Sequence, residues 1–210
     1  MAAETSTRDK LLDAAARLFA ERGIDNVSIA EIVRAAGQRN ASAVHYHFGN
    51  RDEVLKALLA QYVPIIHDRR AELLAIARSL PDTDVHSAVE AVIRPISELA
   101  QRGWRERAYL QIGAELTHWL ARPEAPDMAE LMEQTGGFEA WRLIRERAGA
   151  HLPADLWDER QEIAISFIGR AAADRARLLD IEGEHPILSD DRFVDNLIAM
   201  VVGAMTAPMQ

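Results

Sequence analysis

The side chains that most often carry out chemistry occur in this chain without a catalytic or metal-binding pattern. His45 and His47 lie two positions apart, so on a helix they would point in nearly opposite directions and could not share a metal ion. Glu115-x-x-His118 has the spacing of half of a di-iron site, which needs two such pairs on facing helices, and Glu182-x-x-His185 falls in an expected turn. The chain also lacks cysteine, HExxH, GxSxG and a glycine-rich phosphate loop. We therefore expect no metal, no cofactor and no enzyme activity.

The polar residues between positions 28 and 51 are of the types that contact DNA. A hydroxyl or a methyl group can read a base edge, as at Ser42 or Ala43 on the outer side of an expected helix, and arginines can bind phosphate. Ser28 and Asn40 stand at expected helix starts, where free amides attract phosphate and where either side chain can instead serve only as a cap. The candidate DNA-contacting residues are Ser28, Arg39, Asn40, Ala41, Ser42, Ala43, His45, Tyr46, His47 and Arg51.

Two short helices joined by a sharp turn must position these residues. Apolar residues recur at helical spacing between Ser28 and Gly37. Ser28 is a residue type that caps the start of a helix, and Gly37 is a type that commonly ends one. A second helix is expected over residues 41–48, and residues 5–22 form an amphipathic helix that precedes the pair. Such a helix–turn–helix can place its second helix in the major groove of DNA, although an ordinary helical hairpin in a core has the same pattern.

The composition is that of a globular protein with an acidic body. The chain has 210 residues, of which 49% are hydrophobic, and a formal net charge of −9. Residues 1–52 are neutral, with seven basic and seven acidic residues, so the remainder carries the whole negative charge. This asymmetry is compatible with DNA contact through a local patch, and also with a body that is simply well solvated. With a polar N-terminus and no long apolar run, we expect a cytoplasmic protein with no membrane contact.

The remaining chain is helical in pattern throughout, and no strand-like alternation persists. Pro64 and Pro95 lie inside two of the helical runs and are expected to kink them. Glycine or proline turns separate the runs. The expected fold is all-α with about nine helices, the later ones over residues 51–79, 85–101, 104–121, 127–148, 155–181 and 191–206.

The first 55 or so residues resemble the tetracycline-repressor (TetR) family of bacterial regulators. The resemblance rests on the first-helix stripe ending AxxLFAERG, on the helix VSIAEIVRAAG and on the run HYHFGNRDEVL. The chain departs from the family pattern in the turn GQRNAS, which is one residue longer, with Asn40 in the cap position. His45 occupies the position where the family usually has a tyrosine that contacts phosphate, and Tyr46 is the next residue. Either side chain could therefore take that role.

The resemblance implies a DNA-binding domain over residues 5–62 and a helical domain for ligand binding and dimerisation over residues 63–210. Family members bind a palindromic operator in double-stranded DNA as homodimers. A small apolar or amphipathic effector moves the connecting helix, spreads the two heads and releases the DNA. We therefore expect a transcriptional regulator, and more specifically a repressor.

Two further sets of residues follow from residue type and helix position. Large side chains, some with polar tips, build apolar pockets with a few polar anchors, and they are also common in ordinary cores. The candidate ligand-binding residues are Tyr62, His67, Trp104, Tyr109, His118, Trp119, Trp141 and Phe167. The last two helices have wide apolar faces that suit a four-helix bundle formed by two copies. The candidate interface residues are Phe167, Ala171, Phe193, Leu197, Met200, Val201 and Ala204.

A second function class remains open from the residues alone. The chain could be a helical ligand carrier or enzyme in which the N-terminal head is only structural. A cluster of catalytic or metal-binding side chains in the body would favour that class, and the sequence does not contain one. Binding to DNA upstream of its own gene, with the salt sensitivity of phosphate contacts, separates the two.

Overall fold

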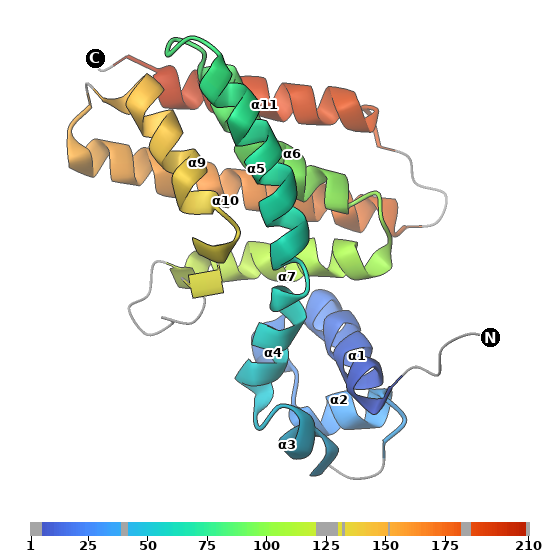
Figure 1. Ribbon diagram of the computed structural model, residues 1–210. Coiled ribbons are helices and arrows are strands. Elements are labelled where there is room, and N and C mark those ends of the chain that lie inside the picture. Colours follow the sequence, from blue (N-terminus) through green and yellow to red (C-terminus); the bar gives the residue numbers. More distant parts are fainter. Residues whose placement is uncertain are drawn as a thin grey trace.

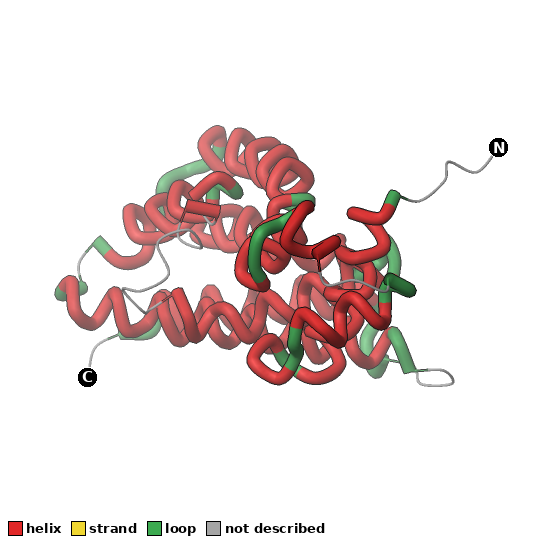
Figure 2. Tube along the Cα trace, turned by 90° about the horizontal axis from the view of Figure 1, so that it is seen from below, coloured by secondary structure: helices red, strands yellow, loops and turns green. Residues whose placement is uncertain are grey.

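The computed structural model describes residues 6–38, 42–120, 130–131, 133–150, 152–181 and 186–208. Over these ranges the chain is helical and contains no strand, as Figure 2 shows from below. This confirms the all-α fold class. Ten α-helices have bounds within the described ranges, and the run 51–79, expected as one long helix or two joined at a kink, forms two.

Four helices and a short 3-10 turn make the N-terminal head. They are α1 (Thr7–Arg22), η1 (Ile24–Asn26), α2 (Ile29–Ala35), α3 (Ser42–His47) and α4 (Arg51–Ala60). Side-chain caps begin three of them: Ser6 accepts from the Asp9 amide, Ser28 from Glu31 and Asn50 from Glu53. Gly23, Gly37 and Gly49 have φ angles of 84°, 69° and 89°, so the chain turns through left-handed backbone after α1, α2 and α3.

Near Pro64, where a kink was predicted, one helix ends and another begins, and the head joins the body there. α4 ends at Ala60, and α5 (Val63–Ser79) begins with Pro64 in its first turn. Proline is tolerated there because the first amides of a helix have no intrahelical partner. Pro95 instead lies inside α6 (Val85–Leu99), and the helix continues through it.

The body is a bundle of the remaining helices. After α6 come α7 (Trp104–Leu120), α9 (Gly137–Ile144), the π-helical turn η2 (Arg145–Gly149), α10 (Ala154–Leu179) and α11 (Asp190–Thr206). Gly136, with a φ of 73°, interrupts the predicted run 127–148 just before α9. In Figure 1, α5 passes in front of α6 with α9 beside it, while α10 and α11 lie behind. No helix in the described ranges is long and apolar enough to cross a membrane.

The helix α7 belongs to the cores of both head and body. Figure 1 shows it lying across the top of the blue head, beneath the rest of the bundle. Ile112 and Leu116 of α7 are buried in the same apolar cluster as residues of α1, α2, α3 and α4. Leu110 of the same helix packs instead with Tyr62 and Ile66 at the start of the body. The head therefore completes its core with a helix of the body.

Candidate functional site

The helix α3, the second of the helix–turn–helix pair, has exposed aromatic side chains on its outer side and a buried valine on its inner side. Val44 is fully buried in the head core, whereas Tyr46 is 86% exposed. The His45 ring lies in solvent, with Nδ1 2.7 Å from the Gly49 carbonyl oxygen, and the His47 ring packs edge-on against Tyr46. Three of the predicted DNA-contacting residues are thus on the outward part of α3. An exposed phenol on this helix is a side chain available for a partner.

Ser28 acts as the cap that its position predicted. Its hydroxyl accepts from the Glu31 amide at 3.3 Å, and its own amide donates to the Glu31 carboxylate at 2.9 Å, which forms a capping box. The hydrogen bonds from the Ser28 amide and hydroxyl lower the pKa of Glu31. Glu31 also pairs with Arg22 at 2.9 Å. A phosphate contact at Ser28 stays a prediction, and it would have to share this helix start with a carboxylate.

Arg51 has a structural role that the sequence did not indicate. Its Nη1 donates to the carbonyl oxygens of Ile24 at 3.1 Å and Val27 at 3.4 Å, and its Nη2 lies 3.6 Å from Asp25. The guanidinium therefore holds the η1 turn against the start of α4. Its predicted contact with phosphate stays a prediction and now competes with these contacts.

Five of the predicted residues cannot be placed completely. Arg39, Asn40 and Ala41 lie outside the described residues, and for Ser42 and Ala43 only the helical backbone of α3 is described. One further basic residue of the head, Arg34 in the last turn of α2, is exposed and was not singled out from the sequence.

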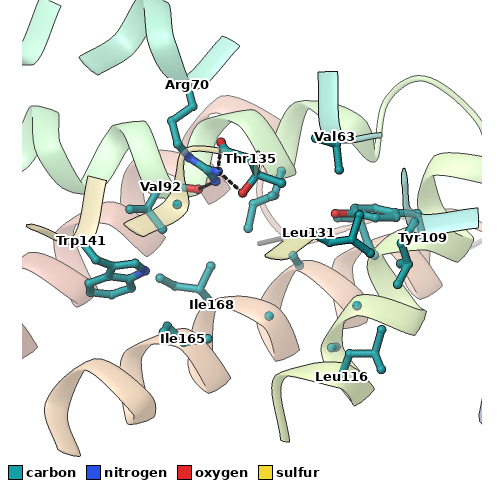
Figure 3. A pocket seen from close by; sticks show the side chains of 18 residues that line it. Val63, Arg70, Val92, Tyr109, Leu116, Leu131, Thr135, Trp141, Ile165 and Ile168 are labelled. Atoms are coloured by element: carbon teal, nitrogen blue, oxygen red, sulfur yellow. Dashed lines mark hydrogen bonds between the residues drawn. The ribbon is translucent and has the colours of Figure 1, made fainter. Parts of the chain in front are cut away.

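An apolar cavity of about 150 Å³ lies in the body between α5, α6, α7, α9 and α10. Figure 3 shows aliphatic side chains and Trp141 around it, with Arg70 and Thr135 forming a polar group on one wall. Burial raises the pKa of Tyr109, on the opposite wall, to about 12, so its phenol stays protonated at neutral pH. The cavity is lined by Leu59, Val63, Arg70, Val92, Ile96, Tyr109, Leu110, Gly113, Ala114, Leu116, Leu131, Thr135, Gly137, Trp141, Ile165, Ile168, Gly169 and Ala172.

Two of the predicted ligand-binding residues, Tyr109 and Trp141, line this cavity. Tyr62 is buried behind Tyr109, with the ring centroids 4.5 Å apart, because the start of α5 packs it into a separate small cluster. The other predicted residues face elsewhere or are not described: Trp104 packs under Arg17, His67 and Phe167 are exposed, and the side chains of His118 and Trp119 lie outside the described set.

Arg70 is the cavity residue that sequence reasoning missed. It is 5% exposed and shares the buried face of α5 with Ile66, Leu73, Leu74 and Ala77. These positions have helical spacing, so the stripe itself contained the signal: an arginine in the register of the core. Its contacts come from α6 and Thr135, which are distant in sequence and could not be inferred.

The same helix that lines the cavity also holds the head in place. Glu115 of α7 accepts from the Ile24 amide at 3.0 Å, and Arg105 pairs with Asp13 through two contacts of 2.6 and 2.7 Å. The guanidinium of Arg17 lies 3.7 Å from the centroid of the Trp104 ring. Glu115, which has the spacing of half of a di-iron site with His118, thus bonds to the head instead. In the described ranges no group of three or more His, Asp or Glu residues could hold a metal ion.

The predicted dimer face must be corrected at two positions. Leu197 and Val201 are 3% and 1% exposed, because α11 packs them into the core of a single chain. They cannot meet a second copy. Of the other predicted residues, Phe167 and Met200 are 39% and 51% exposed. Ala204 is exposed, whereas Ala171 and Phe193 are half-buried. Ile163, one turn before Phe167, is 60% exposed and continues the apolar surface.

The fold and these sites define a class of protein: a helix–turn–helix DNA-binding head joined to a helical body with a ligand-sized cavity. Comparisons with known proteins give the family. A family model described as "Bacterial regulatory proteins, tetR family" matches residues 11–58. The transcriptional regulator TtgR of Pseudomonas putida is 31% identical over 162 residues, 76% of this chain and 74% of TtgR. The chain belongs to the tetR family of bacterial regulatory proteins.

Two further similarities agree with this assignment. The transcriptional repressor KstR2 of Rhodococcus jostii is 27% identical over 165 residues, 79% of this chain and 76% of KstR2. The structure of the ketosteroid transcriptional regulator KstR2 of Mycobacterium tuberculosis matches with a TM-score of 0.61 at 18% identity, over 95% of each chain. The family model and the two sequence relatives, TtgR and KstR2 of Rhodococcus jostii, are those of transcriptional regulators, so the chain is a DNA-binding regulator and not an enzyme.

Proposed function

We propose that this protein is a repressor that binds a palindromic operator as a homodimer and leaves it when a small molecule enters the body. The observation that carries the proposal is the double role of α7, which lines the cavity and completes the core of the head. Residues 5–62 would bind DNA and residues 63–210 would bind the effector and the second copy. Acting on DNA, the protein would work in the cytoplasm.

The contacts of α7 suggest how an effector would reach the head. Tyr109, Gly113 and Leu116 line the cavity, and Glu115 lies between them in the chain and bonds to the Ile24 amide. A ligand that shifts α7 would therefore also shift the start of η1, and with it the position of α2 and α3. Packed interfaces move between discrete arrangements rather than deforming continuously, which favours an all-or-none displacement.

Footprinting on DNA upstream of the gene tests the proposal directly. We expect a protected, two-fold symmetric site, with half-sites about 34–36 Å apart, and protection that weakens steeply with salt. The control is a DNA of equal length with scrambled half-sites. If the protein binds neither DNA at low salt, the head is only structural and the chain is a helical ligand-binding protein.

Replacing Tyr46 by alanine should weaken operator binding and leave stability unchanged. We expect the affinity for the operator to fall about tenfold for each head, or about a hundredfold for a dimer, and the preferred sequence to change, because one base contact contributes about 1–3 kcal/mol. The free energy of unfolding should change by less than about 0.5 kcal/mol, since Tyr46 is 86% exposed. Titration of operator variants and thermal melting measure the two effects. The contrasting variant is Val44→Ala two residues away, which removes a fully buried side chain and should lower stability by about 2 kcal/mol.

Arg39→Ala and Arg51→Ala should differ in stability while both weaken DNA binding. Each lost phosphate contact is expected to reduce the salt dependence of binding by roughly one unit of slope, or roughly two for a dimer, on specific and random DNA alike. Arg51→Ala should also lower the free energy of unfolding by about 1–2 kcal/mol, because it leaves the carbonyls of Ile24 and Val27 without their donor. Gel shifts at several salt concentrations and urea unfolding provide the measurements. If the salt dependence of DNA binding is unchanged in both variants, these arginines do not contact DNA phosphates.

A further inference from the structure

The wall of the cavity holds a buried positive charge without a negative partner. Arg70 donates from Nε to the Ala91 carbonyl at 3.0 Å, from Nη1 to the Thr135 carbonyl and hydroxyl at 2.7 and 2.9 Å, and from Nη2 to the Val92 carbonyl at 3.5 Å. All four acceptors are neutral. No carboxylate in the described ranges pairs with it, whereas the adjacent Arg69 pairs with Glu98 and Glu72. Figure 3 shows the guanidinium of Arg70 beside Thr135 at the cavity.

Part of this arrangement has a structural reason. Proline has no amide hydrogen, so Pro95 cannot donate to the carbonyl of Ala91 four residues earlier in α6. The Nε of Arg70 donates to that carbonyl instead. This role occupies one edge of the guanidinium, and Thr135 occupies Nη1. Nη2 keeps only the long contact to Val92, so donor capacity remains on the group that lines the cavity.

Neutral acceptors satisfy hydrogen bonds but do not cancel a charge. Burial lowers the pKa of Arg70 to about 10, which leaves the group charged at neutral pH. A buried charge is unfavourable unless an opposite charge accompanies it. The cavity therefore favours an anion over a neutral molecule of the same shape, and the spare N–H of Nη2 can donate a charge-assisted hydrogen bond to one oxygen of a carboxylate.

The rest of the cavity sets the size and polarity of the remainder of the ligand. Apart from Arg70, Thr135 and Tyr109, the lining is made of aliphatic residues, glycines and Trp141. The hydroxyl of Tyr109 has no hydrogen-bond partner among the described residues and can donate to a ligand. A largely apolar cavity of about 150 Å³ is large enough for a benzene-sized molecule.

We propose that the effector is a small apolar carboxylate, with its carboxylate on the Nη2 side of Arg70 and a ring-sized or short-chain body against Trp141, Ile168 and Leu116. This inference rests on the proposed function, in which the cavity holds the effector. Arg70 is then the residue that selects an acid over a neutral compound.

Calorimetry on the full chain without DNA tests the ligand class. The probes are phenylacetate and hexanoate, each compared with its neutral amide, phenylacetamide and hexanamide. We expect at least one acid to bind about tenfold or more tightly than its amide, as a charge-assisted hydrogen bond contributes about twice as much as a neutral one. In Arg70→Met the difference should disappear. The matched control is Arg69→Met, which removes the neighbouring surface arginine and should leave the preference for the acid intact.

A second variant locates the binding without touching Arg70. A Cβ added at Gly113 meets no atom within 4 Å, and Gly113 lines the cavity, so Gly113→Leu should fill the space and weaken binding of acids and amides together. If Arg70→Met does not fold, the affinities of acid and amide for the unaltered protein and for Gly113→Leu still test the proposal. They show whether the protein prefers the acid and whether the acid binds in this cavity. Equal binding of acid and amide, a preference that survives Arg70→Met, or no binding of any of the four compounds overturns the proposal.

The outcome is separable from that of the proposed function. Footprinting without any ligand tests repression, and calorimetry without DNA tests the ligand class. If the protein binds an acid but not DNA, the proposed carboxylate site is supported and the proposed repressor function is contradicted. If the protein binds DNA but no acid, the repressor function is supported and the carboxylate site is contradicted.

Discussion

A protein in which Ile163 and Met200 are both replaced by glutamate is expected to be a folded monomer that no longer binds a full operator. These side chains are 60% and 51% exposed on α10 and α11, so the substitution leaves the core of the single chain intact. In a two-fold interface each new carboxylate would face its own copy or a neighbouring apolar surface. Linking two DNA-binding heads raises affinity by about 10²–10⁴-fold, and that factor should be lost with the dimer.

Light scattering and gel shifts measure the two parts of this result. The unaltered protein should scatter as a dimer of 23.4 kDa chains, and the double variant as a monomer with an unchanged melting temperature at low concentration. Ile76→Glu on α5 is the control, because Ile76 is also apolar and 55% exposed but lies outside the proposed interface. If the unaltered protein is a monomer at micromolar concentration, the proposed interface is wrong, and so is the mechanism in which two linked heads bind one operator.

Two glycine-to-alanine substitutions in the body are expected to change stability in opposite directions. At Gly149 an added Cβ would lie 2.0 Å and 2.2 Å from two ring carbons of Trp157, which is 1% exposed and hydrogen-bonded through its ring nitrogen to Gln161. The ring cannot move aside easily, so Gly149→Ala should lower the free energy of unfolding by about 3 kcal/mol or more. For a chain of this length the melting temperature would fall by about 6–12 °C.

Gly113→Ala is the matched counterpart. Its new Cβ meets no atom within 4 Å, and the residue lies inside α7, where glycine is less favourable than alanine by about 1 kcal/mol. We therefore expect a gain in stability of about 1 kcal/mol. Urea unfolding of the two variants and the unaltered protein measures both changes in the free energy of unfolding, the expected loss and the expected gain. A loss at Gly149 no larger than about 0.5 kcal/mol would show that the contact with Trp157 relaxes freely.

Features of the protein that depend on neighbours in the chain could be predicted from the sequence. The cap at Ser28, the turn at Gly37 and the interruption near Pro64 are all local, because each depends on hydrogen bonds or backbone angles within a few residues. The all-α fold follows from periodicity alone, and the helix–turn–helix resemblance from a run of adjacent residues. These observations were sufficient to predict a DNA-binding regulator.

Features that depend on which helices meet were decided only by the tertiary structure. An apolar stripe on α11 does not show whether it faces its own body or a second copy, and packing placed Leu197 and Val201 inside the chain. Arg51 was expected at DNA but holds the carbonyls of Ile24 and Val27, which the fold brings close. Arg70 became part of a cavity wall because α6 and Thr135 surround it. Side-chain type states what a residue can do, and its contacts across the fold determine which of those possibilities it realises.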